Sequence, residues 1–263
     1  MSETDKMLAR REGSVGHLIF NNPERRNAVS LDMWEAATKI LDGFARDSEV
    51  RVVVVSGAGG KAFVSGADIS RFGDERSSEQ AVAHYNTTVD RANTTFYEFP
   101  KPTIAMIRGY CLGGGLGLAV CCDLRVCSDN ARFGIPAAKL GLGYAFPGIK
   151  RLTDLVGPSF AKEIFYTARQ FDAEEARTMG LVNRVVPDAD LETYVRDTAD
   201  TIAANAPLTV NAVKYIVGQA VKDETQRDLG RAAEMVKKCF QSNDYVEGRN
   251  AFMEKRKPVF TGT

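Results

Sequence analysis

The sequence predicts an α/β fold in which a mostly parallel sheet is layered with helices. Two runs rich in β-branched residues, 51–55 and 103–107, have the composition of parallel strands that are covered on both faces. A glycine-rich segment follows each run, residues 65–68 (Ser-Gly-Ala-Asp) after the first and residues 113–115 (Gly-Gly-Gly) after the second, and each is expected to open a helix. Strand, glycine turn and helix therefore alternate, which favours an α/β architecture.

The remaining elements follow from the same periodicities. Residues 17–20 begin as a strand, and residues 124–126 continue the alternation of strands and helices. Ser30 is expected to cap a helix, because apolar residues recur after it at helical spacing. These residues are Trp34, Ala37, Leu41 and Phe44.

Beyond Pro158 the pattern becomes helical, and the C-terminal third is expected to be all helix. The expected helices span residues 160–168, 173–179, 191–205, 210–221, 225–240 and 245–255. Since no linker or repeat interrupts the chain, we predict a core domain over residues 1–195 and a C-terminal helical subdomain over residues 196–263 that serves packing and oligomerisation.

Five strings in this order carry a resemblance to a known family. They are residues 21–28 (Asn-Asn-Pro-Glu-Arg-Arg-Asn-Ala), 63–69 (Phe-Val-Ser-Gly-Ala-Asp-Ile), 109–115 (Gly-Tyr-Cys-Leu-Gly-Gly-Gly), 180–187 and 252–258. Together they resemble the crotonase, or enoyl-CoA hydratase/isomerase, superfamily over nearly the whole chain. The resemblance implies the crotonase (ClpP-like) spiral fold of ββα units. It also implies an acyl-CoA substrate, with coenzyme A as part of that substrate and no other cofactor.

The resemblance also implies roles for individual residues. In the family, the amides that match Ala67 and Gly114 form an oxyanion hole, which binds the thioester oxygen and stabilises an enolate. Residues that match the family's coenzyme A and acyl-chain contacts are Arg25, Arg26, Ala28, Ser65, Gly66, Asp68, Ile69, Gly113, Ala137, Leu142, Phe146, Phe252 and Lys255. Family members assemble as trimers or as pairs of trimers, and Phe252 and Lys255 are expected to reach the coenzyme A of a neighbouring subunit.

The chain departs from the hydratases of this family at two positions. Those hydratases carry one glutamate shortly after the glycine triplet and another after a Phe-Gly-x-Pro string, and the two add water as general base and acid. Here the two positions hold Gly117 and Ala137. Since neither residue transfers a proton, hydration by that route is not expected.

Tyr144 stands a few residues further on, where some isomerases of the family place a carboxylate. The spacing around Tyr144 is similar to the methylmalonyl-CoA decarboxylase branch, in which a tyrosine at this point lies in the acyl pocket. That branch places a histidine where this chain has Ala67. The leading hypothesis is therefore a decarboxylase of a malonyl-CoA-type substrate, in which Tyr144 is the third catalytic residue.

Two alternatives remain open. One is an enoyl-CoA hydratase or isomerase that recruits its acid and base elsewhere, for example from Asp68, Glu75 or His84. His84 is expected on a helix near the pocket wall. The other is a non-catalytic homologue that binds a coenzyme A ester or RNA.

The composition of the chain limits the binding partners and the cellular compartment that we expect. Lys and Arg total 34, as do Asp and Glu, so the formal net charge is zero and no nucleic-acid partner is expected. Five cysteines without a Cys-x-x-Cys string are typical of reduced thiols, and with only two histidines no metal site is expected. The least charged run, residues 109–122, is shorter than the roughly 20 apolar residues of a membrane span. We therefore expect a cytoplasmic protein without a membrane partner.

Overall fold

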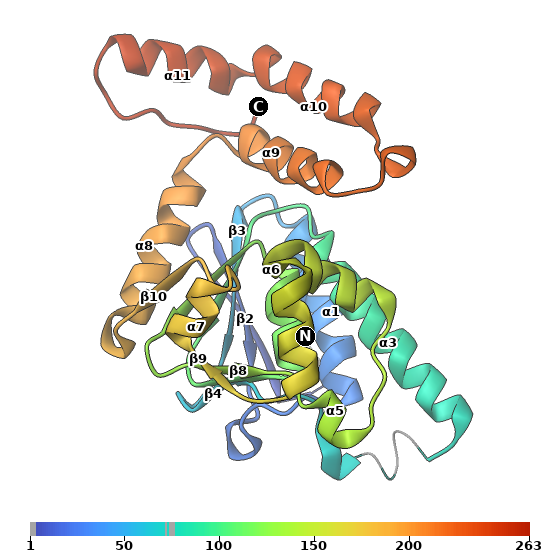
Figure 1. Ribbon diagram of the computed structural model, residues 1–263. Coiled ribbons are helices and arrows are strands. Elements are labelled where there is room, and N and C mark those ends of the chain that lie inside the picture. The colour runs from blue at the N-terminus through green and yellow to red at the C-terminus, as the bar shows by residue number, and fades with distance from the viewer. Residues whose placement is uncertain (1–3, 72, 74–76) are drawn as a thin grey trace.

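The computed structural model describes residues 4–71, 73 and 77–263 and contains two sheets enclosed by helices (Figure 1). The larger sheet has the strand order β1 (Met7–Glu12), β2 (Val15–Phe20), β3 (Val52–Gly57), β5 (Thr103–Ile107), β7 (Leu124–Ser128) and β10 (Arg184–Val186). The smaller sheet has the order β4 (Ala62–Val64), β6 (Tyr110–Leu112), β8 (Arg132–Gly134) and β9 (Phe171–Asp172).

The chain alternates between the two sheets. β3, β5 and β7 pair in parallel in the larger sheet, and each is followed by a strand of the smaller sheet, β4, β6 and β8 in turn. A helix follows each of these strand pairs. Antiparallel pairs occur at the margins, between β1 and β2 and between β8 and β9. The predicted α/β fold of repeating ββα units is therefore confirmed.

Helices cover both faces of the larger sheet (Figure 1). Those before residue 170 are α1 (Leu31–Arg46), α3 (Glu79–Tyr97), α4 (Gly114–Cys121), α5 (Ala137–Leu140) and α6 (Phe146–Thr167). Those after it are α7 (Ala173–Thr178), α8 (Leu191–Ala204), α9 (Pro207–Ala220), α10 (Leu229–Gln241) and α11 (Asn243–Met253). Short 3₁₀ helices span Pro23–Arg25, Ile69–Arg71, Asp188–Asp190 and Glu224–Gln226.

The apolar residues predicted for the first helix form its buried face. Trp34, Ala37, Leu41 and Phe44 of α1 all lie in the main hydrophobic core, between the helix layer and the sheet. Ser30 occupies the position before the helix, as predicted, but its side-chain oxygen accepts no hydrogen bond from a backbone N–H of the first turn, and its hydroxyl donates to the carboxylate of Asp32. The helix is therefore held mainly by burial of its apolar face.

Three local expectations were wrong. α6 begins at Phe146 and not beyond Pro158, and it is kinked at Gly157 (φ 76°), so that the expected helix corresponds to its second half. The C-terminal third also contains β10, whose three residues are too few to show a period. The turn at residues 65–68 leads into the 3₁₀ helix Ile69–Arg71, whereas the second glycine turn opens α4 as predicted.

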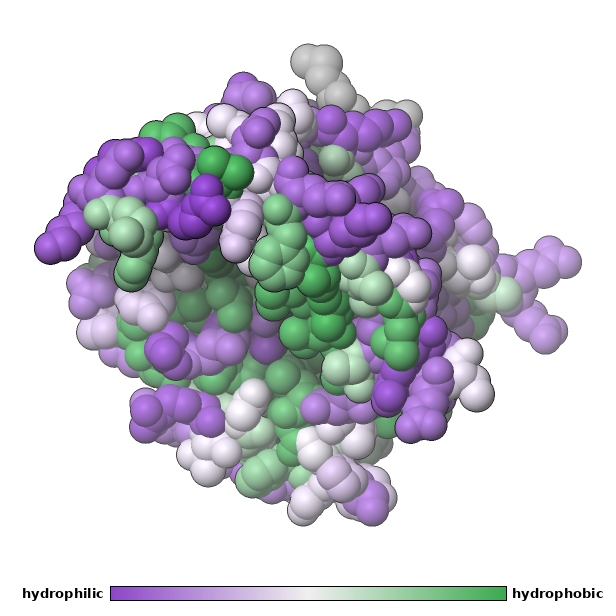
Figure 2. Space-filling view, turned by 90° about the horizontal axis from the view of Figure 1, so that it is seen from above, coloured by the Kyte–Doolittle hydropathy of each residue, from purple (hydrophilic) through white to green (hydrophobic). Residues whose placement is uncertain are grey.

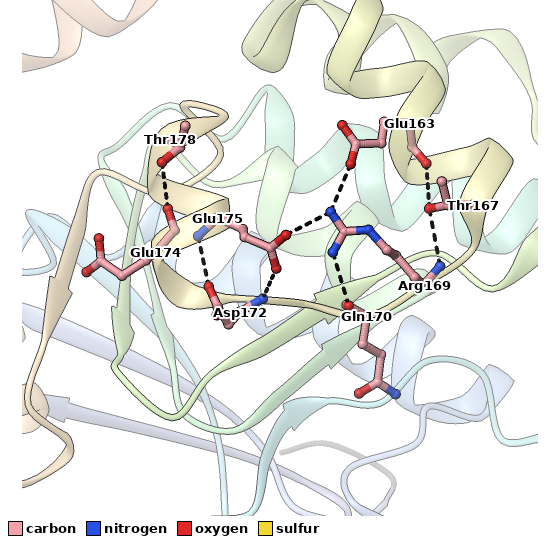
Figure 3. Close-up of polar contacts among 8 residues, drawn as sticks. All are labelled: Glu163, Thr167, Arg169, Gln170, Asp172, Glu174, Glu175 and Thr178. Atoms are coloured by element: carbon pink, nitrogen blue, oxygen red, sulfur yellow. Dashed lines mark hydrogen bonds and ion pairs between the residues drawn. The ribbon is translucent and has the colours of Figure 1, made fainter.

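An arginine joins the segments that support the smaller sheet (Figure 3). Arg169 donates to Glu163 of α6 at 2.8 Å and forms an ion pair with Glu175 of α7, also at 2.8 Å. Asp172 and Glu175 form a capping box at the start of α7. β9 lies between these helices and pairs with β8, so the cluster fixes the edge of the smaller sheet.

α9, α10 and α11 form a layer of their own beside the α/β core (Figure 1). Lys214 of α9 forms an ion pair with Asp123 at 2.7 Å, and Arg51 donates to the carbonyl of Phe260 at 2.7 Å, so the layer is tied to the core. Figure 2 looks at the molecule from this end, and hydrophobic side chains gather around a hollow in the middle of that face. The predicted boundary after residue 195 falls inside α8, whose Val195 packs with the sheet. The role of the last helices in oligomerisation remains a prediction.

Candidate active site

A cavity of about 300 Å³ opens where the two glycine turns meet. Its walls are formed by the two turns, by the segment from α5 to the start of α6, and by one side of α3. The volume lies at the lower end of the range for small-molecule sites. The cavity therefore marks the region in which the predicted site residues are assessed.

The first turn brings the backbone amide of Ala67 to this cavity. Ala67 pairs with Val29 in an isolated parallel bridge. In this bridge the Val29 amide donates to the Gly66 carbonyl at 2.9 Å, and the Asp68 amide donates to the Val29 carbonyl at 3.0 Å. Successive amides of an extended segment point to opposite sides, so the Ala67 amide points away from Val29. Gly66 and Ala67 both line the cavity.

The second turn brings the amide of Gly114 to the same place. Gly114 is the first residue of α4, and the first amides of a helix have no acceptor within it. The two turns approach closely, since a Cβ built on Gly66 would lie 4.0 Å from the Gly114 nitrogen. Gly115 permits this approach, because a Cβ there would lie 2.1 Å from the carbonyl oxygen of Val64.

The amides of Ala67 and Gly114 have no acceptor among residues 4–71, 73 and 77–263. Both residues are half-buried and line the cavity, so a ligand in the cavity can reach their N–H groups. The N-terminus of α4 adds a positive electrostatic potential at Gly114. The arrangement is suited to an oxygen that carries negative charge and bonds to both amides.

The structure brings together several residues predicted for the acyl pocket. Gly117 and Ala137, the positions at which hydratase glutamates are missing, both line the cavity. Tyr144 also lines it and packs edge-on against Phe165, with ring centroids 5.0 Å apart. The remaining predicted residues found in the lining are Ser65, Ile69, Gly113 and Leu142.

Other predicted residues lie outside the cavity lining. The side chain of Phe146 is 74% exposed at the start of α6. Arg25 is exposed and donates to Ser70 at 3.0 Å, whereas Asp68 is buried and accepts a hydrogen bond from the Ser70 hydroxyl at 2.6 Å. The guanidinium of Arg26 lies over the ring of Tyr110, 5.0 Å from its centroid.

Ala28, Phe252 and Lys255 also lie away from the cavity. Ala28 is half-buried just before Val29, so it borders the first turn. Phe252, on α11, is 82% exposed, and Lys255 follows the end of that helix. The contact of Phe252 and Lys255 with the coenzyme A of a neighbouring subunit remains a prediction.

The sequence suggested Asp68, Glu75 or His84 as the acid and base of a hydratase or isomerase. The structure places neither Asp68 nor His84 in the cavity lining. Asp68 is engaged by Ser70 and does not line the cavity. His84 lies on an exposed side of α3, outside the lining. Glu75 lies outside the described residues.

Sequence reasoning missed the wall that α3 contributes. Asn86, Asp90 and Asn93 line the cavity, and their spacing of four and three residues places them on one side of the helix. Trp34 of α1 lies beside them in the lining. The polar spacing was visible in the sequence, but it is equally typical of a solvated helix face, so only the fold distinguishes the two.

The far end of the cavity holds a cation and a buried thiol. Arg151 of α6 donates to Thr94 at 3.1 Å and to the sulfur of Cys121 at 3.7 Å, and its guanidinium lies 4.7 Å from the ring centroid of Tyr97. Burial raises the pKa of Cys121 to about 11, although Arg151 acts in the opposite direction. Cys121 is therefore a neutral thiol at neutral pH and not an activated nucleophile.

The described part of the chain contains no group of three or more His, Cys, Asp or Glu side chains that could hold a metal ion. Among the same residues, no helix combines the length and the apolar character needed to cross a bilayer. The absence of a cofactor and the cytoplasmic location remain predictions.

The sequence is similar to one protein family over almost its whole length. A family model described as enoyl-CoA hydratase/isomerase matches residues 10–263. The chain is 34% identical to the short-chain-enoyl-CoA hydratase of Clostridium acetobutylicum, with 97% of each chain covered. It is 32% identical to the mitochondrial Delta(3,5)-Delta(2,4)-dienoyl-CoA isomerase of Dictyostelium discoideum, over 94% of this chain and 87% of that protein.

A solved structure matches over almost the full length as well. The crystal structure of an enoyl-CoA hydratase/carnithine racemase from Magnetospirillum magneticum aligns with a TM-score of 0.92 at 36% identity. The alignment covers 99% of this chain and 97% of that one. The similarity therefore includes both the α/β core and the C-terminal helices.

Proposed function

We propose that this chain, which belongs to the enoyl-CoA hydratase/isomerase family, decarboxylates an acyl-CoA of the malonyl-CoA type. Membership in the predicted superfamily and the crotonase fold are confirmed by the family match and the structural neighbour. The chain is accordingly an enzyme of acyl-CoA chemistry. The specific reaction is the part that we propose.

One observation carries the proposal. Two unpaired amides, those of Ala67 and Gly114, meet at a cavity in which Gly117 and Ala137 occupy the positions of the missing glutamates. An oxyanion site without a proton-transferring pair supports a reaction that needs charge stabilisation but no general base.

Decarboxylation has this requirement. The bond between the α-carbon and the carboxylate breaks, carbon dioxide leaves, and the electron pair moves into the thioester to form an enolate. The amides of Ala67 and Gly114 hold the enolate oxygen, each contributing about 2.7–4 kcal/mol in comparable sites. A proton from water or from a nearby hydroxyl then returns to the α-carbon and gives the shortened acyl-CoA.

Tyr144 is the side chain proposed to act on the departing group. Its ring is held against Phe165 at the cavity wall, so its hydroxyl has a restricted position. In this role the phenol donates a hydrogen bond to the substrate carboxylate, or supplies the proton to the enolate carbon. Ala137 and Leu142 provide apolar contacts around the same group.

Coenzyme A binding and assembly form the second part of the proposal. Arg25 and Arg26 are exposed near the first turn and offer cations to the phosphates of coenzyme A. Phe252 and Lys255 would reach the coenzyme A of a neighbouring subunit in a homotrimer or a dimer of trimers. Exposed apolar side chains on the last three helices support such packing. They include Val213, Val217, Leu229, Phe240, Phe252 and Met253.

A second candidate function rests on Asp90. This aspartate lines the cavity from α3, and among the residues that the structure describes it is the only carboxylate in the lining. It could therefore serve an enoyl-CoA hydratase or isomerase as a base. The names of the curated relatives favour the same chemistry. A base of this kind would act from α3, whereas the positions of the missing glutamates lie on α4 and α5.

The two functions are separated by incubating the purified protein with a panel of acyl-CoA thioesters and weighing the products. Malonyl-, methylmalonyl- and ethylmalonyl-CoA should lose carbon dioxide, whereas crotonyl-CoA should gain water orders of magnitude more slowly than with a family hydratase. Rapid hydration that is abolished by Asp90→Asn would establish the second function. Binding of coenzyme A esters without any turnover would indicate a non-catalytic homologue.

A further inference from the structure

A cation without an acidic partner lies in the lining of the cavity. Arg151 of α6 lines the cavity and is half-buried. Its guanidinium donates to the Thr94 hydroxyl at 3.1 Å and to the Cys121 sulfur at 3.7 Å, and it lies 4.7 Å from the ring centroid of Tyr97. Cys121 lines the cavity as well, so the guanidinium lies beside the lining and not only the stem of the side chain.

These contacts hold Arg151 in place but do not compensate its charge. Asp154, which follows it on α6, is paired with Lys150 at 2.8 Å. Cys121 brings no negative charge at neutral pH, because burial raises the pKa of its thiol to about 11. Charged groups that are withdrawn from water usually have a partner of opposite charge. A guanidinium has several N–H donors, so the two hydrogen bonds to Thr94 and Cys121 leave donors for a ligand.

Asp90 is the other charged residue in the described lining, and it does not neutralise Arg151. It lies on α3 one helical turn before Thr94, but no ion pair joins it to Arg151 within the described part of the chain. An anionic ligand that reaches Arg151 therefore lies near Asp90 too, and the aspartate should weaken its binding. This repulsion gives a second way to test where such a ligand lies.

α4 relates the position of Arg151 to that of the oxyanion amides. Gly114 opens this helix, Cys121 ends it, and Gly117 lies between them in the cavity lining. At a rise of about 1.5 Å per residue, the first and last residues of α4 are about 10 Å apart. Because Arg151 contacts Cys121, its guanidinium lies roughly that far from the amide proposed to hold the thioester oxygen.

This separation sets the length of an acyl chain that reaches Arg151. A carbon–carbon bond is about 1.5 Å long, and a zigzag chain advances by roughly 1.2 Å per bond. About six such bonds and a hydrogen bond of about 3 Å at their end span the distance. The carboxylate that leaves in the proposed decarboxylation is attached to the α-carbon, so it is too close to the thioester to reach the guanidinium.

We propose that the acyl group of the substrate ends in a carboxylate, about six bonds beyond the thioester carbon, and that this carboxylate pairs with Arg151. The inference rests on the proposed function in one respect, namely that the acyl chain of a coenzyme A thioester occupies this cavity with its oxygen at the amides of Ala67 and Gly114. It does not depend on whether the reaction is decarboxylation or hydration.

Binding of unreactive ligands tests the inference. Titration calorimetry would compare adipoyl-, pimeloyl- and suberoyl-CoA with hexanoyl-, heptanoyl- and octanoyl-CoA, which have the same chain lengths but no second carboxylate. For at least one length the dicarboxylic chain should bind roughly 10- to 100-fold more tightly than its monocarboxylic counterpart, because only the dicarboxylic chain forms a hydrogen bond between two charged groups.

Variants assign this preference to Arg151. Arg151→Met keeps the length of the side chain and should abolish the preference, while the monocarboxylic chain binds at least as tightly as in the parent. Arg151→Lys keeps the charge without the planar fork and should retain part of the preference. Asp90→Asn should increase it. Lys150→Met is the matched control, because it removes the same charge from the neighbouring position of α6, outside the lining, and should leave the preference unchanged.

Three results would overturn the inference. Equal affinity of the dicarboxylic and monocarboxylic chains at every length would do so while leaving the proposed function intact. A preference that persists in Arg151→Met would assign the carboxylate to another group. If that variant does not fold, Arg151→Lys decides, since a reduced preference supports the inference and an unchanged one contradicts it. Failure of the parent to bind any acyl-CoA would refute the proposed function itself, and the inference with it.

Discussion

Two of the walls of the cavity differ in the kind of atom that they present. The turn wall, formed by residues 65–67, 113–114 and 116–117, offers the backbone amides of Ala67 and Gly114. The helix wall, formed by α3 and Trp34, offers the side chains of Asn93 and its neighbours. The turn wall is suited to the oxygen that every thioester carries, whereas the helix wall is suited to what differs between acyl chains.

This difference separates the common part of the chemistry from the specific part. Backbone amides are the same whatever the residue, so their position is set by turn geometry and by the close approach of Gly66 and Gly115 to neighbouring backbone. Side chains on a helix change without altering the fold. We therefore expect the family chemistry to depend on the turn wall and the choice of substrate to depend on the helix wall.

The largest expected effect concerns the turn wall, at Gly114. Gly114→Pro removes the amide hydrogen at the first position of α4, where proline is tolerated in a helix. If this amide holds the enolate oxygen, kcat should fall about 100- to 1000-fold. Steady-state decarboxylation of a malonyl-type thioester, followed by mass spectrometry, measures the loss.

Gly114→Ala is the matched control, because it keeps the amide hydrogen. Its Cβ would lie 3.8 Å from Trp34, which is an ordinary contact. This variant should retain most of the activity, and circular dichroism should show both variants folded. Equal activity of the proline and alanine variants would remove Gly114 from the catalytic site.

The next effect concerns the packing that holds the turn wall in place. Gly115→Ala would place a Cβ 2.1 Å from the Val64 carbonyl oxygen, so the backbone of β4 or α4 has to move. We expect a loss of about 3 kcal/mol in the free energy of unfolding, measured with urea. Gly117→Ala, two residues further along the same helix, has open space at its Cβ and should gain about 0.5–1 kcal/mol. A similar change in both variants would contradict the close approach of the two turns.

Tyr144 lies in the segment between α5 and α6, outside both walls, and its substitution should have a moderate effect. Tyr144→Phe keeps the ring contact with Phe165 and removes the hydroxyl. Loss of a hydrogen bond to a charged group costs about 1.5–3 kcal/mol, which corresponds to a roughly 10- to 150-fold lower rate with a malonyl-type substrate. Binding of a saturated acyl-CoA should be unchanged, as calorimetry would show. An unchanged rate of decarboxylation would assign Tyr144 to packing alone.

The difference between the two walls also explains which parts of the cavity lining could be predicted from the sequence. The turn wall was predictable because its signals are local, a strand followed by glycines, and Ala67, Gly114, Gly117 and Ala137 all line the cavity. The helix wall was not predictable, since polar residues at helical spacing occur equally on solvated helices. Phe146 shows the opposite error, because its string was treated as pocket lining although it begins a helix with an exposed side chain.

The short strands of the smaller sheet could not be predicted from the sequence for a different reason. β4, β6 and β8 have three residues each, which is too few for a period-two pattern. These strands nevertheless place both glycine turns, because β4 ends just before the first turn and β6 just before the second. The repeating ββα unit was therefore implied by resemblance to the family and not by the strands themselves.

The smallest expected effect concerns the layer behind the turn wall, at the end of α4. Burial raises the pKa of the Cys122 thiol from 9.0 to about 12. A thiol whose pKa is raised in the folded state keeps its proton at a pH at which the unfolded chain releases it. Its contribution to stability is therefore complete below about pH 9 and is lost as the pH rises toward 12.

Cys122→Ala removes this titration. Between about pH 8 and about pH 10 the parent should lose about 1 kcal/mol more in the free energy of unfolding than the variant does, because at the higher pH the thiol is ionised mainly in the unfolded chain. Urea unfolding at the two pH values measures the difference. Cys239→Ala, at the half-exposed cysteine of α10, removes a thiol outside this layer and serves as the reference variant. An equal loss in Cys122→Ala would mean that Cys122 ionises in the folded protein as readily as in the unfolded chain, and that water reaches the layer on which the oxyanion turn is built.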